Sequence, residues 1–484
     1  MFFLKLRVLF AISIIYIENC SFMNVKLALF KNLLSGSLSK ISTIGIRLLQ
    51  VPILLSALGA EEYGRWLIIS SLPSWLVLAN LGFGSVAGNE ISMAIGAGDN
   101  NGAVKVYSTT IALISILAFI CSILVIIIAP IIPWANIMSI LPYRQGEIVY
   151  SIVLLSLSIF ISFLAEAFGV RFRAAHKNHV GVLLSSIRPW VELLFLMIFM
   201  KFNKGFQFIS LSIFLSTIFY LLLIWWFSRK LIRELSFSIQ NVDKTIIKNI
   251  FKKGVAFQAF PLGNAMLFQG NLLVIQSVLG PIAVAAFATA RTLVRSINQI
   301  FELINQVIWP ELSHLIGAKK YEKASQIHRL GVISAIVVSF TLVIILSLIG
   351  VPIYTLWTGK EISLSQNLLV LFLIPIPFNA LWFTSSVVHA ATNQHESLAK
   401  RYLLGSIISV ICCYFFSKFF GLGGAAVSTI VLDILLIPFV LKHSLTILNE
   451  SWETFITEIF NDIKKMKDLN IIDYVKKITI NLVI

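Results

Sequence analysis

The stretch GSLSKISTIGIRLLQVPILLSALGAEEYGRWLIISSLPSWLVLANLGFGSVAGNEI, residues 36–91, holds two long apolar segments on either side of a short polar connection. The apolar segments cover about 33–57 and 66–91, and the connection between them includes AEEYGR. A helix needs about 20 mainly apolar residues to cross the hydrocarbon core of a bilayer. Both segments reach that length, so this stretch predicts two consecutive membrane-spanning helices.

The whole chain has the composition of a membrane protein. Of its 484 residues, 58% are hydrophobic and only 12% are charged, about half the charged share of an ordinary soluble domain. A soluble protein of this size has no single core that buries so much apolar surface. The composition therefore excludes a soluble enzyme, a secreted disulfide scaffold and a disordered chain. The four cysteines are interpreted as small buried hydrophobes.

Twelve stretches in all are long and apolar enough to cross a membrane, which predicts an all-α, polytopic membrane protein. They cover about 33–57, 66–91, 106–130, 148–170, 180–200, 206–227, 255–279, 282–309, 330–353, 366–390, 401–420 and 423–441. The segments between them are too short for a folded extramembrane domain.

The distribution of Lys and Arg predicts the orientation of the chain. With the N-terminus inside, the inside segments hold 27 of these residues and the outside segments hold 6, and cytoplasmic loops are the ones enriched in Lys and Arg. We therefore expect both termini in the cytoplasm. The net charge of +16 is explained by this loop bias, so no nucleic-acid partner is predicted.

The domain organisation follows from the spans. We expect an N-terminal six-helix bundle at 23–230 and a C-terminal six-helix bundle at 255–441. A cytoplasmic linker with an amphipathic helix at 231–254 joins them, and the tail at 442–484 carries an amphipathic helix that lies in the membrane interface. The apolar run within residues 1–22 is too short to span, so this segment is predicted to be an upstream extension before a natural start at Met23.

The two halves of the chain match at a constant offset of 221 residues. Leu58–Gly59 matches Leu279–Gly280, Glu90 matches Glu311, and the triplet Ile95–Ala97 matches Ile316–Ala318. Six spans in each half give both halves the same topology, so a real match means two parallel repeats related by an axis along the membrane normal. A shared hydropathy rhythm is the alternative explanation.

Five cations lie within predicted spans: Lys40, Arg47, Arg188, Arg291 and Arg295. A charge at bilayer depth costs about 2.5–3.5 kcal/mol, so it normally faces a cavity or a partner. Ion pairing or snorkelling to the interface explains Lys40 and Arg188 almost as well as function does. Arg47, Arg291 and Arg295 lie deeper, in both halves, and guanidinium groups match phosphate oxygens. These five cations are the predicted binding residues for an anionic substrate.

Three acidic residues within spans, Glu166, Glu302 and Asp433, are candidates for coupling to a proton or sodium gradient, and Glu302 is equally explained as a partner of a nearby arginine. The chain carries no HExxH, GxSxG or Gly-rich phosphate loop. We therefore expect no catalytic residues, no metal site and no cofactor.

Residues 36–91 resemble the start of the O-antigen flippases (Wzx-type) of the polysaccharide transporter family, within the superfamily of multidrug, oligosaccharidyl-lipid and polysaccharide exporters. The resemblance rests on the block LG-x-E-x-YG-x-W at Leu58–Trp66 and on LGFGS at Leu81–Ser85, and it is strongest over the first 110 residues. It implies a MATE-like fold of two six-helix bundles that form a V around a cationic cavity.

The resemblance also implies a function and a place. The family moves undecaprenyl-pyrophosphate-linked oligosaccharide, an O-antigen or capsule repeat unit, across the bacterial inner membrane by alternating access. On this interpretation Arg47, Arg291 and Arg295 bind the pyrophosphate, Lys40 and Arg188 guide it, and membrane lipids surround the protein. The alternatives are an ion-coupled multidrug exporter of the same superfamily, which needs acidic groups in its cavity, and a membrane polysaccharide polymerase or ligase, which needs a large outside loop.

Overall fold

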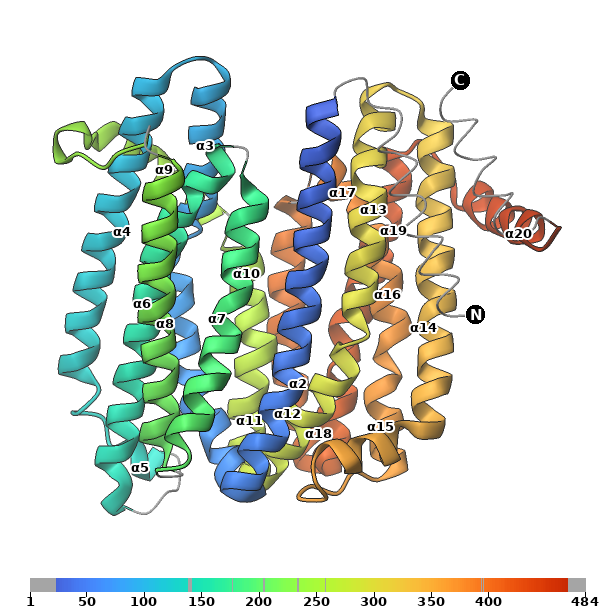
Figure 1. Cartoon of the computed structure of the whole chain (residues 1–484). Helices are drawn as coiled ribbons and strands as arrows, with labels where there is room; N and C mark the ends of the chain where they lie inside the picture. The colour runs from blue at the N-terminus through green and yellow to red at the C-terminus, as the bar shows by residue number, and fades with distance from the viewer. Residues whose placement is uncertain are drawn as a thin grey trace. The chain divides into compact units, whose positions relative to one another are not determined.

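The computed structural model describes residues 23–137, 142–175, 177–202, 205–232, 235–256, 258–392, 394 and 396–468 (Figure 1). Within these ranges the regular structure is all helical, and no strand is present. The all-α fold predicted from the sequence is therefore confirmed. The proposed extension at 1–22 lies outside the described residues.

The chain forms two compact units. The N-terminal unit comprises Asn32–Thr289 and Thr355–Ser363, and the C-terminal unit comprises Ala290–Tyr354 and Leu364–Ile484 together with the residues up to Lys31. Helices α2, α12 and α14 therefore each contribute residues to both units. The domain bounds predicted at 23–230 and 255–441 stay a prediction.

The N-terminal unit is built mainly from long helices that pack side by side. Helix α6 packs against α3, α4 and α8, and α7 packs against α8. The elements up to the unit boundary are α2 (Met23–Ser74), η1 (Trp75–Asn80), α3 (Phe83–Gly96), α4 (Asn100–Ile128), α5 (Trp134–Ile137), η2 (Pro142–Arg144), α6 (Gln145–Ala174), α7 (Asn178–Phe199), α8 (Phe206–Leu231), η3 (Ile239–Asn241), α9 (Lys244–Ala256), α10 (Ala259–Ala265), the π-helical η4 (Met266–Gly270), α11 (Asn271–Leu279) and α12 (Pro281–Arg295).

In the C-terminal unit, α19 packs against both α16 and α18, and α13 packs against α17. The elements are α13 (Asn298–Gly317), α14 (Tyr321–Trp357), α15 (Gln366–Leu373), α16 (Pro375–Ser385), α17 (Val387–Ala391), α18 (Glu396–Ser428), α19 (Ile430–Ile447) and α20 (Trp452–Asp468). Three short helices, α15 to α17, follow one another where the sequence predicts one span at 366–390.

Ten helical segments among the described residues are long and apolar enough to cross a membrane, where the sequence predicts twelve spans. The first two predicted spans are counted as one because α2 continues through a kink at Gly59. The predicted eighth span is divided between α12 and α13 by a turn at Ser296 and Ile297. The protein is thus a multi-pass membrane protein, and all twelve predicted stretches contain helix.

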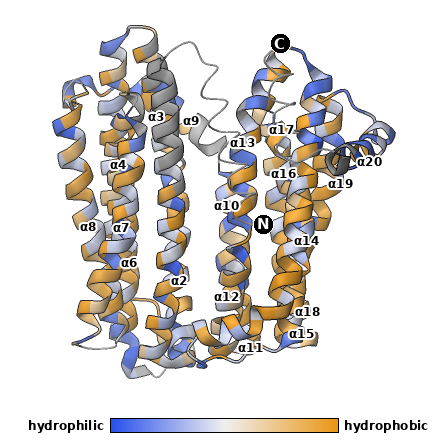
Figure 2. Ribbon diagram, turned by 45° about the vertical axis from the view of Figure 1, so that its right-hand side comes forward, coloured by the Kyte–Doolittle hydropathy of each residue, from blue (hydrophilic) through white to orange (hydrophobic). Residues whose placement is uncertain are grey.

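The surfaces of the long helices are suited to lipid. On α4, Tyr107 and Ile114 are buried in the core of the N-terminal unit, whereas Phe119 is 68% exposed. Figure 2 shows that hydrophobic residues dominate the long helices of each unit. Exposed apolar faces of this extent are typical of helices that contact lipid.

The backbone repeats at the same offset of 221 residues as the sequence. Gly59 has φ 76° and Gly280 has φ 83°, so the first span of each half ends in a conformation that favours glycine. Helices α2 and α12 end at Ser74 and Arg295, and α3 and α13 end at Gly96 and Gly317. The equivalent residues Gly98 and Lys319 both have positive φ, and their N–H groups donate to the carbonyls of Ile95 and Ile316, each at 3.0 Å. This agreement supports a structural repeat over a shared hydropathy rhythm.

Candidate functional site

In the N-terminal unit, two of the predicted cations lie around one carboxylate. Gln50 on α2 donates a hydrogen bond from Nε2 to Oε1 of Glu192 on α7 at 3.0 Å. Glu192 also interacts electrostatically with Arg188, one turn away on α7, and with Arg47 on α2. The structure therefore brings Arg47 and Arg188 together, with Glu192 as their shared counter-charge.

The contact between α2 and α7 is held by a second hydrogen bond. Trp190 donates from Nε1 to Oγ of Ser42 at 2.6 Å. Arg47 is exposed, while Lys40, two turns earlier on α2, is half-buried. The side chain of Arg47 therefore lies at the surface of the helix pair.

Arg188 is turned towards α8 by two contacts. Its Nη2 donates to Oγ1 of Thr217 at 3.1 Å, and its guanidinium lies 6.0 Å from the ring centroid of Tyr220. Arg188 is half-buried. These contacts, together with the nearby charge of Glu192, stabilise the charge of Arg188 inside a span.

Glu166 on α6 lies at the break in the second predicted span. It accepts a hydrogen bond from Nδ2 of Asn80 at 2.7 Å, and a Cβ on Gly84 would lie only 2.6 Å from its Oε1. Gly84 is in the first turn of α3, where backbone N–H groups favour a nearby carboxylate. Glu166 therefore holds the broken span to α6.

Asp433 on α19 is the most enclosed of the three predicted acidic residues. It is 4% exposed, and its Oδ1 accepts hydrogen bonds from Nε1 of Trp382 at 2.6 Å and from Nδ2 of Asn379 at 3.0 Å, both on α16. Two neutral donors stabilise the carboxylate, so Asp433 is held rigidly between α16 and α19.

Arg291 and Arg295 lie next to each other on α12, close to the Asp433 site. Arg295 is exposed and interacts electrostatically with Tyr402 on α18, which also interacts with Asp433. The ring of Tyr402 lies 6.1 Å from that of Trp382. The structure therefore links Arg295 to Asp433 through Tyr402 in the C-terminal unit, and Arg291 lies one turn before Arg295 on α12.

Two other residues singled out by the sequence lie in separate surroundings. Glu302, the third predicted acidic residue, is half-buried on α13, and the amide of Gln299 lies 3.5 Å from its Oε1. Trp66, a residue of the LG-x-E-x-YG-x-W block, is 4% exposed and packs against Phe206 with ring centroids 6.0 Å apart. Trp66 is therefore a core residue in this structure.

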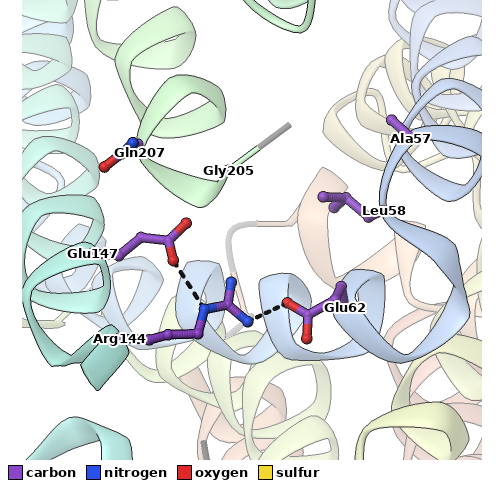
Figure 3. Close-up of a pocket in the computed structure, with 7 residues that line it drawn as sticks. All are labelled: Ala57, Leu58, Glu62, Arg144, Glu147, Gly205 and Gln207. Carbon is purple, nitrogen blue, oxygen red and sulfur yellow. Dashed lines mark hydrogen bonds and ion pairs between the residues drawn. The ribbon is translucent and has the colours of Figure 1, made fainter. Parts of the chain in front are cut away.

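A polar network that the sequence did not reveal lines an open pocket of about 480 Å³ in the N-terminal unit. Figure 3 shows Arg144 between Glu62 and Glu147; its Nη1 donates to Glu62 at 2.6 Å and its Nε donates to Glu147 at 3.0 Å. Glu147 also accepts from the backbone N–H of Phe206 at 2.7 Å. Burial acts to lower the pKa of Arg144, but the hydrogen bonds of Glu62 and Glu147 outweigh it, so the pKa is raised.

The carboxylates of this pocket are already engaged within the protein. Glu62 bonds to Arg65 as well as to Arg144. The network therefore acts as a clamp that ties the segment of α2 after Gly59 to α6 and to the start of α8, and it is not assigned to substrate.

Among known proteins, the sequence has a partial match to a curated transporter. No family model matches the chain. A curated protein of Shigella dysenteriae with the name "Putative O-antigen transporter" is 26% identical over 176 residues, which cover 36% of this chain and 43% of that protein. The chain thus matches less than half the length of this relative.

The similarity to solved structures extends over nearly the whole chain. An inward-facing multidrug resistance MATE family transporter of the MOP superfamily superposes with a TM-score of 0.71 at 17% identity, covering 85% of this chain and 96% of that one. A MOP superfamily transporter from Pyrococcus furiosus, reported to have a binding pocket of reversed polarity, superposes with a TM-score of 0.61 at 15% identity, covering 88% and 96%.

These likenesses agree with the resemblance found in the sequence. The O-antigen transporter supports it at the level of sequence, and the MATE structures support it at the level of fold. The protein has the fold of the MOP superfamily transporters and is related in sequence to an O-antigen transporter.

Proposed function

We propose that the protein is a flippase that translocates undecaprenyl-pyrophosphate-linked oligosaccharide, an O-antigen or capsule repeat unit, by alternating access. The observation that supports the proposal is that both units contain arginines within predicted spans, Arg47 in one and Arg291 with Arg295 in the other. The similarity to an O-antigen transporter of Shigella dysenteriae supports the same substrate class. We further propose that the membrane is the bacterial inner membrane, with both termini in the cytoplasm.

In this proposal the arginines recognise the charged part of the substrate. A pyrophosphate presents oxygens that accept hydrogen bonds from a guanidinium fork, and a charge-assisted bond of this kind contributes about 1.5–3 kcal/mol. Arg47 and Arg295 are exposed, so their donors reach a ligand without unfolding of a helix. Lys40 and Arg188 guide the anion towards them.

The acidic residues serve a different step. Flipping a charged headgroup in one direction needs an energy source, and the chain has no nucleotide-binding loop. Asp433 and Glu166 each hold helices together through a carboxylate. Binding of H⁺ or Na⁺ at these carboxylates would weaken those contacts, which is how an ion gradient drives a change between conformations. Glu302 is a third candidate for this role.

The decisive test is complementation of a strain that lacks its flippase. We expect Arg291→Ala to lower surface polysaccharide by about tenfold or more, because one charge-assisted contact is lost. Lipid-linked oligosaccharide should accumulate on the cytoplasmic face. Arg291→Lys, which keeps the charge but loses the fork, should give an intermediate level.

A matched control comes from the same unit. Lys400 is an exposed cation on α18 that pairs with Glu396, one turn away, so Lys400→Ala should leave export unchanged. Full surface polysaccharide in Arg291→Ala, at normal protein abundance, would contradict the assigned site. No polysaccharide from the wild-type chain would contradict the function itself.

Multidrug export is the second candidate function, because several of the similar structures are multidrug transporters. Cationic drugs favour acidic binding groups, and here Asp433 is enclosed by Trp382 and Asn379. We therefore favour the anionic substrate. A rise in resistance to cationic dyes on overexpression, without any effect on surface polysaccharide, would decide for drug export.

A further inference from the structure

Three histidines that play no part in the proposed substrate site lie close together in the C-terminal unit. His389 is on α17, His443 on α19 and His328 on α14. His389 Nε2 and His443 Nδ1 are 2.9 Å apart, and the two rings have centroids 4.8 Å apart. His328 and His389 are fully buried and His443 is half-buried. A direct hydrogen bond between two imidazoles needs a proton on one of the two facing nitrogens only.

The hydrogen bonds of Ser444 favour one tautomer of His389. Its hydroxyl donates to the carbonyl of Ser385 at 3.0 Å. Since a hydroxyl has a single proton, Ser444 Oγ is an acceptor towards His389 Nδ1, which lies 3.4 Å away. In the favoured tautomer His389 carries its proton on Nδ1, and its Nε2 accepts from the N–H of His443 Nδ1. The lone pair on Nε2 of His443 then remains available to a proton.

We propose that the His443–His389 pair, oriented by Ser444, is a proton-binding site, and that the proton is the ion whose gradient drives this transporter. The extra proton binds to Nε2 of His443, which becomes an imidazolium, and its existing N–H bond to His389 is kept. No other bond forms or breaks. Imidazole suits this role because its charge changes between about pH 5 and 8. The coupling of the proton to transport rests on the proposed function. The proton-binding site itself rests only on the positions of His443, His389 and Ser444.

The surroundings of the pair are compatible with reversible protonation of His443. His443 stacks on the ring of Phe439, with an interplanar angle of 18° and centroids 5.5 Å apart, and an aromatic face stabilises an imidazolium. The guanidinium of Arg401 lies 3.7 Å from the centroid of the same ring, and its positive charge disfavours protonation. The bound proton is therefore held loosely, as a transported ion must be.

Other charged groups lie on the elements packed against the pair. His328 interacts electrostatically with Arg329 and with His389, and Arg329 is paired with Glu450 and Asp462. Further titratable or charged side chains lie on the adjoining helices. They include Glu302, Glu311 and His314 on α13, Glu396, Lys400 and Tyr402 on α18, Lys442 on α19, and Glu453 and Glu458 on α20. Arg329 is thus paired with two carboxylates, and its charge still acts on His328.

The pair shares its helix interface with Asp433. His443 and Asp433 lie ten residues apart on α19, about 15 Å along the helix axis. His443 bonds to α17, and Asp433 bonds to α16. By the predicted topology the histidines lie at the cytoplasmic end and Asp433 lies deeper. The interface of α19 with α16 and α17 thus contains two groups that can bind a proton, at different depths in the membrane. Protonation of these groups can change the contacts that hold α19 in place.

The first arm of the test observes the site directly. Full-length protein labelled with [¹⁵N]histidine is placed in nanodiscs and its imidazole resonances are followed from pH 5 to 8. We expect a coupling across the N–H···N bond between His389 and His443, and one shared protonation step. His443→Gln should remove the step, whereas His314→Gln, at an exposed position on α13, should remove one independent resonance only. Two uncoupled rings would overturn the proposal.

The second arm measures coupling in proteoliposomes with a fluorescent polyprenyl-pyrophosphate oligosaccharide. A difference of one pH unit is about 1.4 kcal/mol per proton, so it should shift the ratio of probe between the leaflets by about tenfold. His443→Gln should still equilibrate the probe, at a ratio that no longer responds to pH. An unaltered response in His443→Gln, or a wild-type response to Na⁺ alone, would overturn the proposal. If the wild-type chain moves no probe, the proposed function fails and the imidazole spectra alone decide whether the proton site exists.

Discussion

The residues of the block LG-x-E-x-YG-x-W at Leu58–Trp66 have separate physical duties. Gly59 supplies a positive φ at the kink of α2. Glu62 pairs with Arg65 and Arg144, and Trp66 fills the core against Phe206. Gly64 allows a close approach, since a Cβ built on it would lie 1.9 Å from the carbonyl oxygen of Pro281. Each of these residues thus has its own structural role: Gly59 forms a kink, Glu62 forms ion pairs, Trp66 packs in the core, and Gly64 permits a close backbone contact.

Gly64→Ala should destabilise the protein by about 1–3 kcal/mol, because the backbone of α12 has to move away from the new methyl group. The measurement is the thermal midpoint of the purified protein in one detergent. Gly45→Ala is the control, since Gly45 is on the same helix with no atom within 4 Å of a Cβ. Alanine favours helix there, so its midpoint should be equal or higher. An unchanged midpoint for Gly64→Ala would contradict the close contact.

Local spacing revealed some of the site residues and missed others. The four-residue spacing of Arg188 and Glu192 is enough by itself to place both side chains on one helix face. The bond from Gln50 to Glu192 joins residues 142 positions apart, and the bond from His389 to His443 joins residues 54 apart. No helical period relates such positions, so only the packing of α2 on α7 and of α17 on α19 reveals them.

At the scale of elements, α20 shows how a predicted amphipathic helix is attached. Its Phe455 is buried and packs near His328 on α14, with ring centroids 5.8 Å apart. Arg329 on α14 bonds to Glu450, just before α20, and to Asp462 within it at 3.0 Å. Burial raises the pKa of Glu450, and the charge of Arg329 opposes that rise.

Arg329→Ala should release α20 from the C-terminal unit. The side chains of Glu450 and Asp462 are 3% and 1% exposed, and a buried charge that loses its partner costs about 3–5 kcal/mol. The carboxylates therefore regain water by undocking the helix. Hydrogen exchange of the amides at 452–468 should become faster.

Two further variants separate the contribution of the ion pairs from that of apolar contacts to the docking of α20. Phe455→Ala, which removes an apolar contact, should have a smaller effect in the same direction. Phe460→Ala should have none on docking, because Phe460 is 68% exposed. Equal exchange rates in Arg329→Ala and the wild-type protein would show that the ion pairs do not attach α20.

Elements are predicted better where they are long than where they break. The apolar stretch 106–130 corresponds to α4, which runs from Asn100 to Ile128. The division of 282–309 into α12 and α13, and of 366–390 into α15, α16 and α17, does not follow from the hydropathy pattern. Hydropathy measures the affinity of side chains for lipid, and it is blind to a local change of φ and ψ within an apolar run.

At the scale of the whole molecule, the twelve-span topology predicts which loops face each side of the membrane. With the native cysteines replaced by Ser, Glu361→Cys should react with an impermeant maleimide added to spheroplasts. Asn101→Cys should react only after the cells are opened. Both positions are exposed, so access depends on the side of the membrane alone.

The opposite labelling pattern would reverse the orientation inferred from Lys and Arg. Labelling of both positions from one side would instead contradict the number of spans between them. The opposite pattern would also move the histidine pair to the other face of the membrane, and with it the side from which a proton enters.

Gly98 and Lys319 occupy equivalent places, and both adopt positive φ, although only glycine does so without strain. The second half thus has the same bend, with lysine where the first half has glycine. Gene duplication followed by divergence would produce this pattern, because the path of the chain is kept while side chains are exchanged around it. After such a duplication the two halves can differ in the carboxylates within their predicted spans, Glu192 in one and Asp433 in the other, while both keep the same path of the chain.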